Sequence, residues 1–412
     1  MPSATLAIDF GTSNSAAAVL DNGRPRRIPI ERDAETLPTA VFFPETGSMQ
    51  IGSAAGDALI AGHEGRYMRA LKSVLGDPLM HESRLIGGKR RTLAEIVTAF
   101  LETVRTRAEA ATGMAFRHAL SGRPVHFHSR DAARDAAAEP DLRDCYLAAG
   151  FESVRFLHEP EAAALASHGL SRTGETGLIV DIGGGTSDFS VFRSEGGRAR
   201  ILASHGIRLG GTDFDHAVSM NHAMPLLGHG GQLRREMGEG LLPVPNAVYV
   251  DLSTWAKIPF LYTAETRRSV AAMARLAVDP ARLNRLSTVL EDELGHDLAF
   301  AVERGKIAAN GGQGDSRIAM GLIEPGLAAR VTPDSLDAAL AAHRGELWQA
   351  AHETLRMAGT APSEIGAIVL VGGSSLMRLV PETMLMLCPN AEVHKTEAFT
   401  AVVDGLALAT GD

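Results

Sequence analysis

Two glycine-rich turns in this sequence combine residue types that can hold a phosphate group and a metal ion. The first, at residues 11–15, reads Gly-Thr-Ser-Asn-Ser and follows an apolar stretch that carries Asp9. The second, at residues 183–188, reads Gly-Gly-Gly-Thr-Ser-Asp and follows an apolar stretch that carries Asp181. Glycine lets backbone N–H groups approach a phosphate closely, and the hydroxyls add donors. Each Asp can reach Mg²⁺ through water, because this ion tends to keep its hydration shell.

The two turns repeat each other. Residues 8–14 and 180–188 share Asp, Gly, Thr, Ser and then Asn or Asp in the same order. Their separation is too long for a solenoid repeat and is typical of a duplicated domain. We therefore expect two similar halves whose turns face each other and hold the phosphates of a nucleotide from both sides.

A third glycine-rich turn, Gly-Gly-Ser-Ser at residues 372–375, follows an apolar strand at residues 368–371 but lacks an Asp. A turn without acidic groups suits a neutral part of the ligand, such as ribose and base. A P-loop is excluded, because its best match, residues 83–90, has Ser for the first Gly and Arg at the Mg²⁺-binding Ser or Thr. A Rossmann motif is also excluded, because the first turn leads into a second strand and an Asn22-Gly23 hairpin rather than a helix.

The elements that must position these turns alternate between strands and helices, which predicts an α/β fold. Strands are expected at residues 5–10, 16–20, 26–30, 177–182, 189–192, 198–204 and 368–371. One helix should begin after a capping box formed by Thr92 and Glu95 and end near Gly113. Another should run from Pro333 to Gly359. Residues 216–309 are largely helical in pattern and predict an inserted subdomain.

Composition narrows the possible functions. The net charge of −9 and the short basic run at residues 89–91 give no sign of nucleic-acid binding. Two cysteines need no disulfide framework and suit a reducing cytoplasm. The N-terminus has no secretory signal, and charged residues and a turn interrupt the longest apolar stretch, residues 365–388, so no membrane contact is expected. The histidines show no standard metal-ligand spacing.

Taken together, these motifs resemble the ATPase domain of the seventy-kilodalton heat-shock chaperones, a family of the actin-like ATPase superfamily. Residues 7–15 and 180–188 are similar to its two phosphate motifs, and residues 157–166 to its first connecting helix. Residues 209–215 and 369–375 resemble the segment after the second phosphate motif and the adenosine motif. The resemblance spans residues 5 to about 410. It implies a duplicated actin-like, ribonuclease-H-like fold with two lobes, at 1–170 and 171–412, a central nucleotide cleft and a helical insertion at about 216–309.

The resemblance also implies roles for individual residues. Asp9 and Asp181 would hold the hydrated Mg²⁺, and Lys72 would reach the phosphates. Glu159 would help to order the attacking water, and Thr186 with Asp188 would complete the shell around the γ-phosphate and the cation. Lys72, Glu159, Asp181 and Thr186 form the expected catalytic set. The expected nucleotide-binding set is Asp9, Gly11, Thr12, Ser13, Asn14, Gly183, Gly184, Gly185, Thr186, Asp188, Gly210, Gly211, Glu303, Lys306, Gly372, Gly373 and Ser374.

Three departures from the family pattern affect the expected function. Leu376 and Ile307 stand where the family has arginines that stack on adenine, so base selectivity should be weak. The sequence stops at Asp412, near the expected end of the ATPase domain, as in short bacterial chaperone-like forms. We therefore expect a cytoplasmic chaperone-like protein without its own peptide-binding domain that binds ATP or ADP with Mg²⁺ and hydrolyses ATP slowly. Its protein client or partner stays open.

Alternatives are a nucleotide-sensing scaffold with weak or lost catalysis, a small-molecule kinase of the same superfamily and a filament-forming actin relative. The segment at residues 157–164 and Lys72 argue against the last two.

Overall fold

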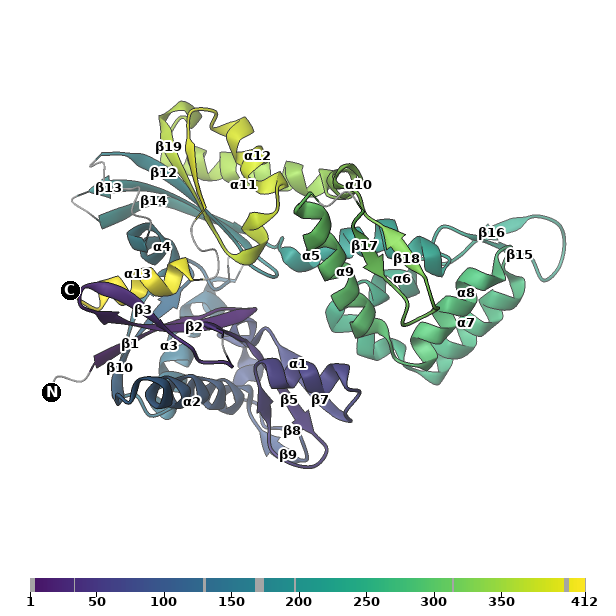
Figure 1. Cartoon of the computed structure of the whole chain (residues 1–412), viewed down its shortest axis with the longest axis horizontal. Helices are drawn as coiled ribbons and strands as arrows, with labels where there is room; N and C mark the ends of the chain where they lie inside the picture. The colour runs from purple at the N-terminus through teal and green to yellow at the C-terminus, as the bar shows by residue number, and fades with distance from the viewer. Residues whose placement is uncertain are drawn as a thin grey trace. The chain divides into compact units, whose positions relative to one another are not determined.

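The protein is described here by a computed structural model covering residues 4–32, 34–128, 131–166, 174–195, 198–312, 315–395 and 400–411. The chain forms two compact units (Figure 1). The first unit comprises Met1–Arg208, Leu347–Leu376 and Val380–Asp412, and the second comprises Leu209–Glu346 and Met377–Leu379. The boundary expected at residues 170 and 171 lies outside the described residues, so the assignment of two lobes to 1–170 and 171–412 stays a prediction.

The first sheet of the first unit has the strand order β11-β10-β1-β2-β3. Strands β1, β2 and β3 are antiparallel neighbours, whereas β10 and β11 continue the sheet in parallel. Asn22 and Gly23 between β2 and β3 have φ values of 51° and 75°, which confirms the predicted tight hairpin. The bounds are β1 Ala4–Phe10, β2 Asn14–Asp21, β3 Arg24–Ile28, β10 Phe116–Arg123 and β11 Ser153–His158; β4, Thr36–Pro38, also pairs with β2.

The second sheet repeats this plan with the order β14-β13-β12-β19-β20. Strands β12, β13 and β14 are antiparallel, and β19 and β20 extend the sheet in parallel from β12. The bounds are β12 Thr176–Ile182, β13 Ser187–Glu195, β14 Arg198–Ile207, β19 Ile365–Val371 and β20 Glu392–Lys395. The predicted duplication of an α/β unit is therefore confirmed.

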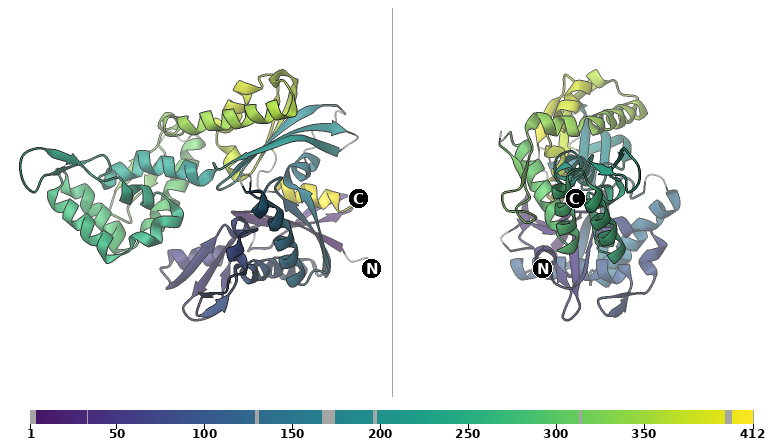
Figure 2. Two further views of the ribbon diagram at one scale, coloured as in Figure 1. Left: turned by 180° about the vertical axis from the view of Figure 1, so that it is seen from behind. Right: turned by 90° about the vertical axis from the view of Figure 1, so that its right-hand side faces the viewer.

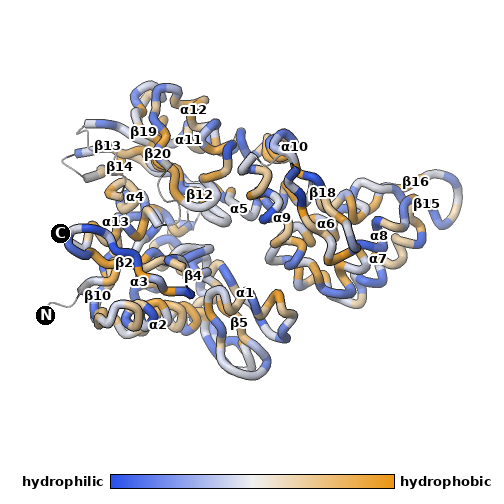
Figure 3. The backbone as a smooth tube through the Cα atoms, in the orientation of Figure 1, coloured by the Kyte–Doolittle hydropathy of each residue, from blue (hydrophilic) through white to orange (hydrophobic). Residues whose placement is uncertain are grey.

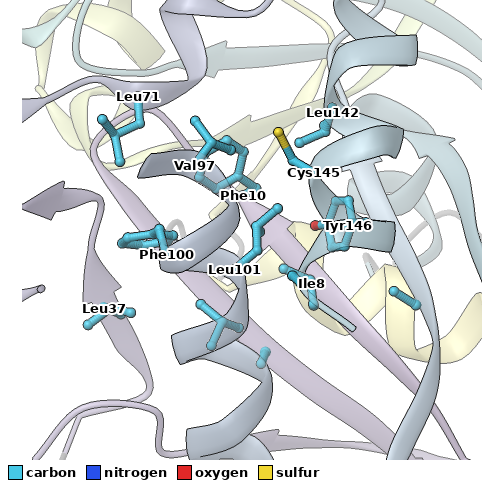
Figure 4. Close-up of a cluster of buried hydrophobic side chains, with 14 of the residues drawn as sticks. Ile8, Phe10, Leu37, Leu71, Val97, Phe100, Leu101, Leu142, Cys145 and Tyr146 are labelled. Carbon is cyan, nitrogen blue, oxygen red and sulfur yellow. The ribbon is translucent and has the colours of Figure 1, made fainter. Parts of the chain in front are cut away.

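Helices cover both faces of the first sheet. On one face, Ile8 and Phe10 of β1 pack against Val97, Phe100 and Leu101 of α2, Leu93–Thr112 (Figure 4). Helix α3, Ala132–Ala148, adds Leu142, Cys145 and Tyr146 to this core. Thr92 and Glu95 form the predicted capping box, and Gly113 follows α2 with φ 68°.

Two helices lie between the sheets. Helix α4, Glu159–Ala166, and helix α13, Ala401–Ala409, share a buried cluster with Ala7 and Ala18 of the first sheet and Ile179 and Val369 of the second. A Cβ at Gly405 of α13 would clash with the carbonyl of Ala162 in α4, so the two backbones cross closely there. Two further helices lie along the opposite face of the second sheet (Figures 1 and 2). They are α11, Ala341–Ala358, from Leu347 onwards, and most of α12, Leu379–Leu387.

A smaller layer follows β4 in the chain. Strands β6, β5 and β7 form a three-stranded sheet, and α1 packs on β5. The 3₁₀ turns η1 and η2 and the hairpin of β8 and β9 connect this layer to α2. The bounds are β5 Ala40–Pro44, β6 Gln50–Ile51, α1 Ser53–Ile60, β7 Gly65–Arg69, η1 Leu71–Val74, η2 Pro78–His81, β8 Arg84–Ile86 and β9 Lys89–Arg91.

The second unit is mainly helical, and residues 216–309, for which an inserted subdomain is predicted, lie within it. The changes between hydrophobic and hydrophilic segments along its helices can be followed in Figure 3. The prediction of one continuous helix from Pro333 to Gly359 is wrong in detail. The backbone leaves helical geometry at Leu340, so this segment forms two helices, α10 and α11. The bounds are α5 Gly211–Val218, β15 Gln232–Arg234, β16 Leu241–Pro243, α6 Ala247–Leu252, α7 Ala264–Leu276, α8 Pro280–Glu291, α9 Gly295–Asn310, β17 Arg317–Ala319, β18 Ala328–Arg330 and α10 Pro333–Ala339. Within the described residues, no helix combines the length and apolar character that a bilayer crossing requires.

Candidate functional site

The two predicted phosphate turns connect equivalent strands of the two sheets. Residues 11–13 join β1 to β2, and residues 183–186 join β12 to β13. In each case the Asp is the penultimate residue of the incoming strand. Asp9 pairs with Ala16 across β1 and β2, and Asp181 pairs with Asp188 across β12 and β13. The repeated sequence thus places two carboxylates at matching ends of the two sheets.

The two turns lie against each other. A Cβ built on Gly184 would come within 2.5 Å of Ser13 Oγ, so the missing side chain is what allows this approach. Gly11 has a different constraint, because a Cβ there would clash with the carbonyl of Asn14. Buried Thr39 holds the first turn: its N–H donates to the Ser13 carbonyl at 2.8 Å, and its Oγ1 lies 2.8 Å from Ser15 Oγ. Nothing in the sequence motif identified Thr39, which lies outside the repeat.

The third turn lies beside the second carboxylate. Asp181 of β12 pairs in parallel with Val371 of β19, and Gly372 follows directly. Gly372 has φ 79°, and a Cβ there would lie 2.5 Å from the Ile182 carbonyl oxygen and 2.7 Å from Asp181 Oδ1. Gly373 and Ser374 continue into a 3₁₀ turn, Gly373–Leu376. A glycine is required at position 372 for both conformation and space.

Lys72 and Glu159 form an ion pair in the same unit. Lys72 Nζ lies 2.5 Å from Glu159 Oε1, and the two side chains are 10% and 12% exposed. Lys72 stands on η1, while Glu159 opens α4 directly after β11. Gly122 of β10 makes room for Glu159, because a Cβ at Gly122 would lie 3.1 Å from Glu159 Cγ. Residues far apart in the sequence are therefore brought together as the predicted catalytic pair.

Asp9, Asp181 and Asp188 form an acidic cluster around this pair. Burial raises the pKa of Asp9 to about 8, and repulsion from Glu159 and Asp181 adds to the rise. Burial together with Glu159 raises the pKa values of Asp181 and Asp188 to about 7. Lys72 opposes each of these shifts. Burial alone would lower the pKa of Lys72, but Glu159, Asp9 and Asp181 raise it.

The carboxylates of Asp9, Asp181 and Asp188 suit a hydrated divalent cation. The described residues include no group of three or more His, Cys, Asp or Glu side chains arranged to hold a metal ion directly. Burial and repulsion from Glu159 raise the pKa values of the acidic cluster despite Lys72, so a bound cation would favour the ionised carboxylates. Carboxylates that reach Mg²⁺ through water are common, because the ion dehydrates reluctantly.

Four of the predicted nucleotide-binding residues belong to the second unit. Gly210 and Gly211 begin α5, where the Gly210 N–H donates to Asp213 Oδ2 at 2.8 Å. Glu303 is exposed on α9, but Lys306 on the same helix is buried and lies 2.8 Å from Asp215 Oδ1. The sequence motif at residues 209–215 contains Asp215, but its pairing with Lys306 was missed. Lys306 therefore joins α9 to α5.

The two positions that depart from the family pattern carry exposed apolar side chains. Ile307 of α9 is 58% exposed, and Leu376 after the third turn is 41% exposed. Thr12, Asn14, Gly183 and Gly185 are partly exposed, and Ser13 and Thr186 are exposed at the surfaces of their turns. Both turns are thus at least partly exposed, although the N–H of Gly183 already donates to the Thr186 carbonyl at 2.9 Å.

Duplicated sheets joined by crossing helices, with opposed glycine-rich turns and paired aspartates, define a two-lobed fold of the actin-like ATPase type. A family model described as Hsp70 protein matches residues 80–227. The chaperone protein DnaK of Methanothermobacter thermautotrophicus is 35% identical over an alignment of 226 residues, and the match covers 53% of this chain. The match covers 35% of that relative's length. Part of this chain is therefore similar to proteins of the Hsp70 family, and the chain spans about a third of the length of the relative that it matches.

Proposed function

We propose that the first unit binds ATP or ADP with Mg²⁺ and hydrolyses ATP slowly. The observation that carries this proposal is the contact between the turns at Gly184 and Ser13, with Asp9 and Asp181 at the adjoining strand ends. Opposed turns of this kind present backbone N–H groups and hydroxyls to phosphate oxygens from two directions. The glycine at 372 lets the third turn pack directly beside Asp181, where we expect the ribose end of the nucleotide.

The residues of the site divide the work of phosphoryl transfer. Bound Mg²⁺ would be held through water by Asp9 and Asp181 and would neutralise phosphate charge. Lys72 would bind a phosphate oxygen and would give up part of its contact with Glu159. Glu159 would then accept a hydrogen bond from the attacking water and orient it, while Thr186 and Asp188 complete the polar shell. In such reactions the protein mainly positions groups and neutralises charge.

The role of Glu159 can be tested by comparing two changes on the same helix. Glu159→Gln should lower ATP turnover about 10²-fold, the usual lower range for loss of a catalytic acid or base. Glu161→Gln is the matched control, because Glu161 also stands in the first turn of α4 and contacts His158 rather than Lys72. Equal turnover by wild type and Glu159→Gln would remove Glu159 from the mechanism.

The wider role follows the family. We propose a chaperone-like protein of the cytoplasm, where buried free cysteines such as Cys145 and Cys388 remain reduced. The proposed partners are a nucleotide and a protein client, whereas nucleic acids and membranes are not expected partners. A nucleotide-sensing scaffold is the second candidate, because exposed apolar residues at 307 and 376 offer the base no cation. Turnover of ATP by the purified protein distinguishes the two.

A further inference from the structure

The segment that carries Lys72 has little secondary structure of its own. Lys72 stands on η1, a 3₁₀ turn of four residues that follows Ala70, whose φ of 57° is left-handed. Short 3₁₀ turns have few internal hydrogen bonds and weak hydrogen-bond geometry. Leu71 and Leu75 are buried on either side of Lys72. The position of the Lys72 side chain must therefore depend on tertiary contacts to the adjoining backbone.

Those contacts come mainly from α3 and the loop before it. The carbonyl of Leu75 accepts a hydrogen bond from His128 Nε2 at 2.6 Å. The N–H of Gly76, a buried residue with φ 74°, donates to Asp141 Oδ2 at 2.9 Å. A Cβ at Gly76 would clash with the carbonyl of Arg134 in α3, so the segment lies directly on this helix.

Asp141 holds the segment at two points. Its Oδ1 lies 2.9 Å from His81 Nε2 at the end of η2, and its side chain is only 13% exposed. Its neighbour Leu142 belongs to the same core as Leu71, and Figure 4 shows both side chains in this cluster. Before Lys72 in the chain, the packing of Leu71 connects η1 to α3. After Lys72, the hydrogen bond of the Gly76 N–H to Asp141 connects the same segment to α3.

We propose that Asp141 is a positioning residue that holds Lys72 against Glu159 by fixing the backbone at Gly76, four residues further along the chain. Its significance for hydrolysis rests on the proposed function, but its effect on Lys72 does not. Asp141 acts through the backbone, since Glu159, Asp9 and Asp181 are the carboxylates that raise the pKa of Lys72. Asp141→Leu leaves the buried Gly76 N–H without its acceptor, whereas Asp141→Asn keeps an acceptor oxygen.

The first test measures the position of Lys72 without nucleotide. The chain contains only five lysines, so brief acylation followed by peptide mass spectrometry can measure each one. Exposed Lys89 is the internal reference, and buried Lys306, paired with Asp215 in the second unit, reports general unfolding. Asp141→Leu should increase labelling of Lys72 relative to Lys89 and leave Lys306 unchanged. Asp141→Asn and a control on the exposed face of α3, Asp144→Leu, should match wild type.

The second test measures turnover. Asp141→Leu should lower kcat about tenfold or more, because small misplacements remote from the chemistry can cost up to about 10² in rate. Its KM for ATP should stay close to the wild-type value, because the phosphate turns are untouched, and Asp141→Asn should recover most of the rate. Should Asp141→Leu not fold, Asp141→Ser serves the same purpose, since its hydroxyl is too short to reach Gly76.

Unchanged Lys72 labelling in the folded Leu or Ser variant would overturn the proposal, as would equal losses in the Leu and Asn variants. If wild type fails to bind or hydrolyse ATP, the proposed function fails, and the labelling result still decides the role of Asp141.

Discussion

Replacing Lys72 with Met removes the cation beside the acidic cluster and keeps a side chain of similar length. Lys72 Nζ lies 2.5 Å from Glu159 and is only one-tenth exposed, so water cannot fully replace its charge. Loss of one donor that stabilises transition-state charge costs about 10²- to 10³-fold in rate, about 2.7–4 kcal/mol. We expect the lower end, about 10²-fold, because Mg²⁺ shares the neutralisation of the phosphates.

Nucleotide binding should change much less than the rate. The turns at Ser13 and Gly184 and their backbone N–H groups remain in Lys72→Met, so affinity for Mg-ATP should stay within about tenfold, 1.4 kcal/mol. Phosphate release under single turnover measures the rate, and calorimetry measures affinity. Lys89→Met, which removes an exposed lysine from β9, is the matched control. Wild-type turnover by Lys72→Met, or an equal loss of affinity and rate, would refute the assigned role of Lys72.

Three further predictions follow from the site. Without a cation at position 307 or 376, ATP and GTP affinities should agree within about tenfold. In a competition titration, Leu376→Arg should increase the affinity for ATP more than the affinity for GTP. A hundredfold preference of wild type for ATP would contradict this. The raised pKa values of the acidic cluster, about 8 for Asp9 and about 7 for the others, mean that the folded protein binds more protons than the unfolded chain between about pH 4 and pH 8. The free energy of unfolding without ligand should therefore contain a contribution that falls as pH rises through this window, and Mg-ADP should reduce the fall. Denaturant titrations across this range would show no such fall if the cluster were ionised throughout. Finally, Gly372→Ala should weaken nucleotide binding measurably, whereas Gly359→Ala, with φ 63° and open space around it, should only lower stability by about 1–2 kcal/mol; equal affinities of the two variants would exclude close packing at the third turn as a requirement.

The local pattern of the sequence predicts much of the fold. The repeated Asp-Gly-Thr-Ser segment predicts both sheets and both turns, because strand alternation and glycine requirements act over a few residues. The capping box at Thr92 and the hairpin at Asn22 are local for the same reason and are confirmed.

Contacts between distant segments could not be predicted in this way. The pairing of Lys306 with Asp215 depends on how α9 packs on α5, and the support of the first turn by Thr39 depends on the path of the chain after β4. The break at Leu340 also escaped the pattern, since apolar spacing continues through it. For Lys72 and Glu159 the family resemblance supplied candidates, and the structure adds the geometry of their ion pair.

Calorimetric titration of the purified protein with ATP and with ADP, each with and without Mg²⁺, tests the central claim most directly. We expect saturable binding of both nucleotides in the presence of Mg²⁺ and markedly weaker binding after its removal with a chelator, because Asp9 and Asp181 then repel the phosphates. Absence of binding heat for both nucleotides at about millimolar concentration, a free energy weaker than about −4 kcal/mol, would contradict the account.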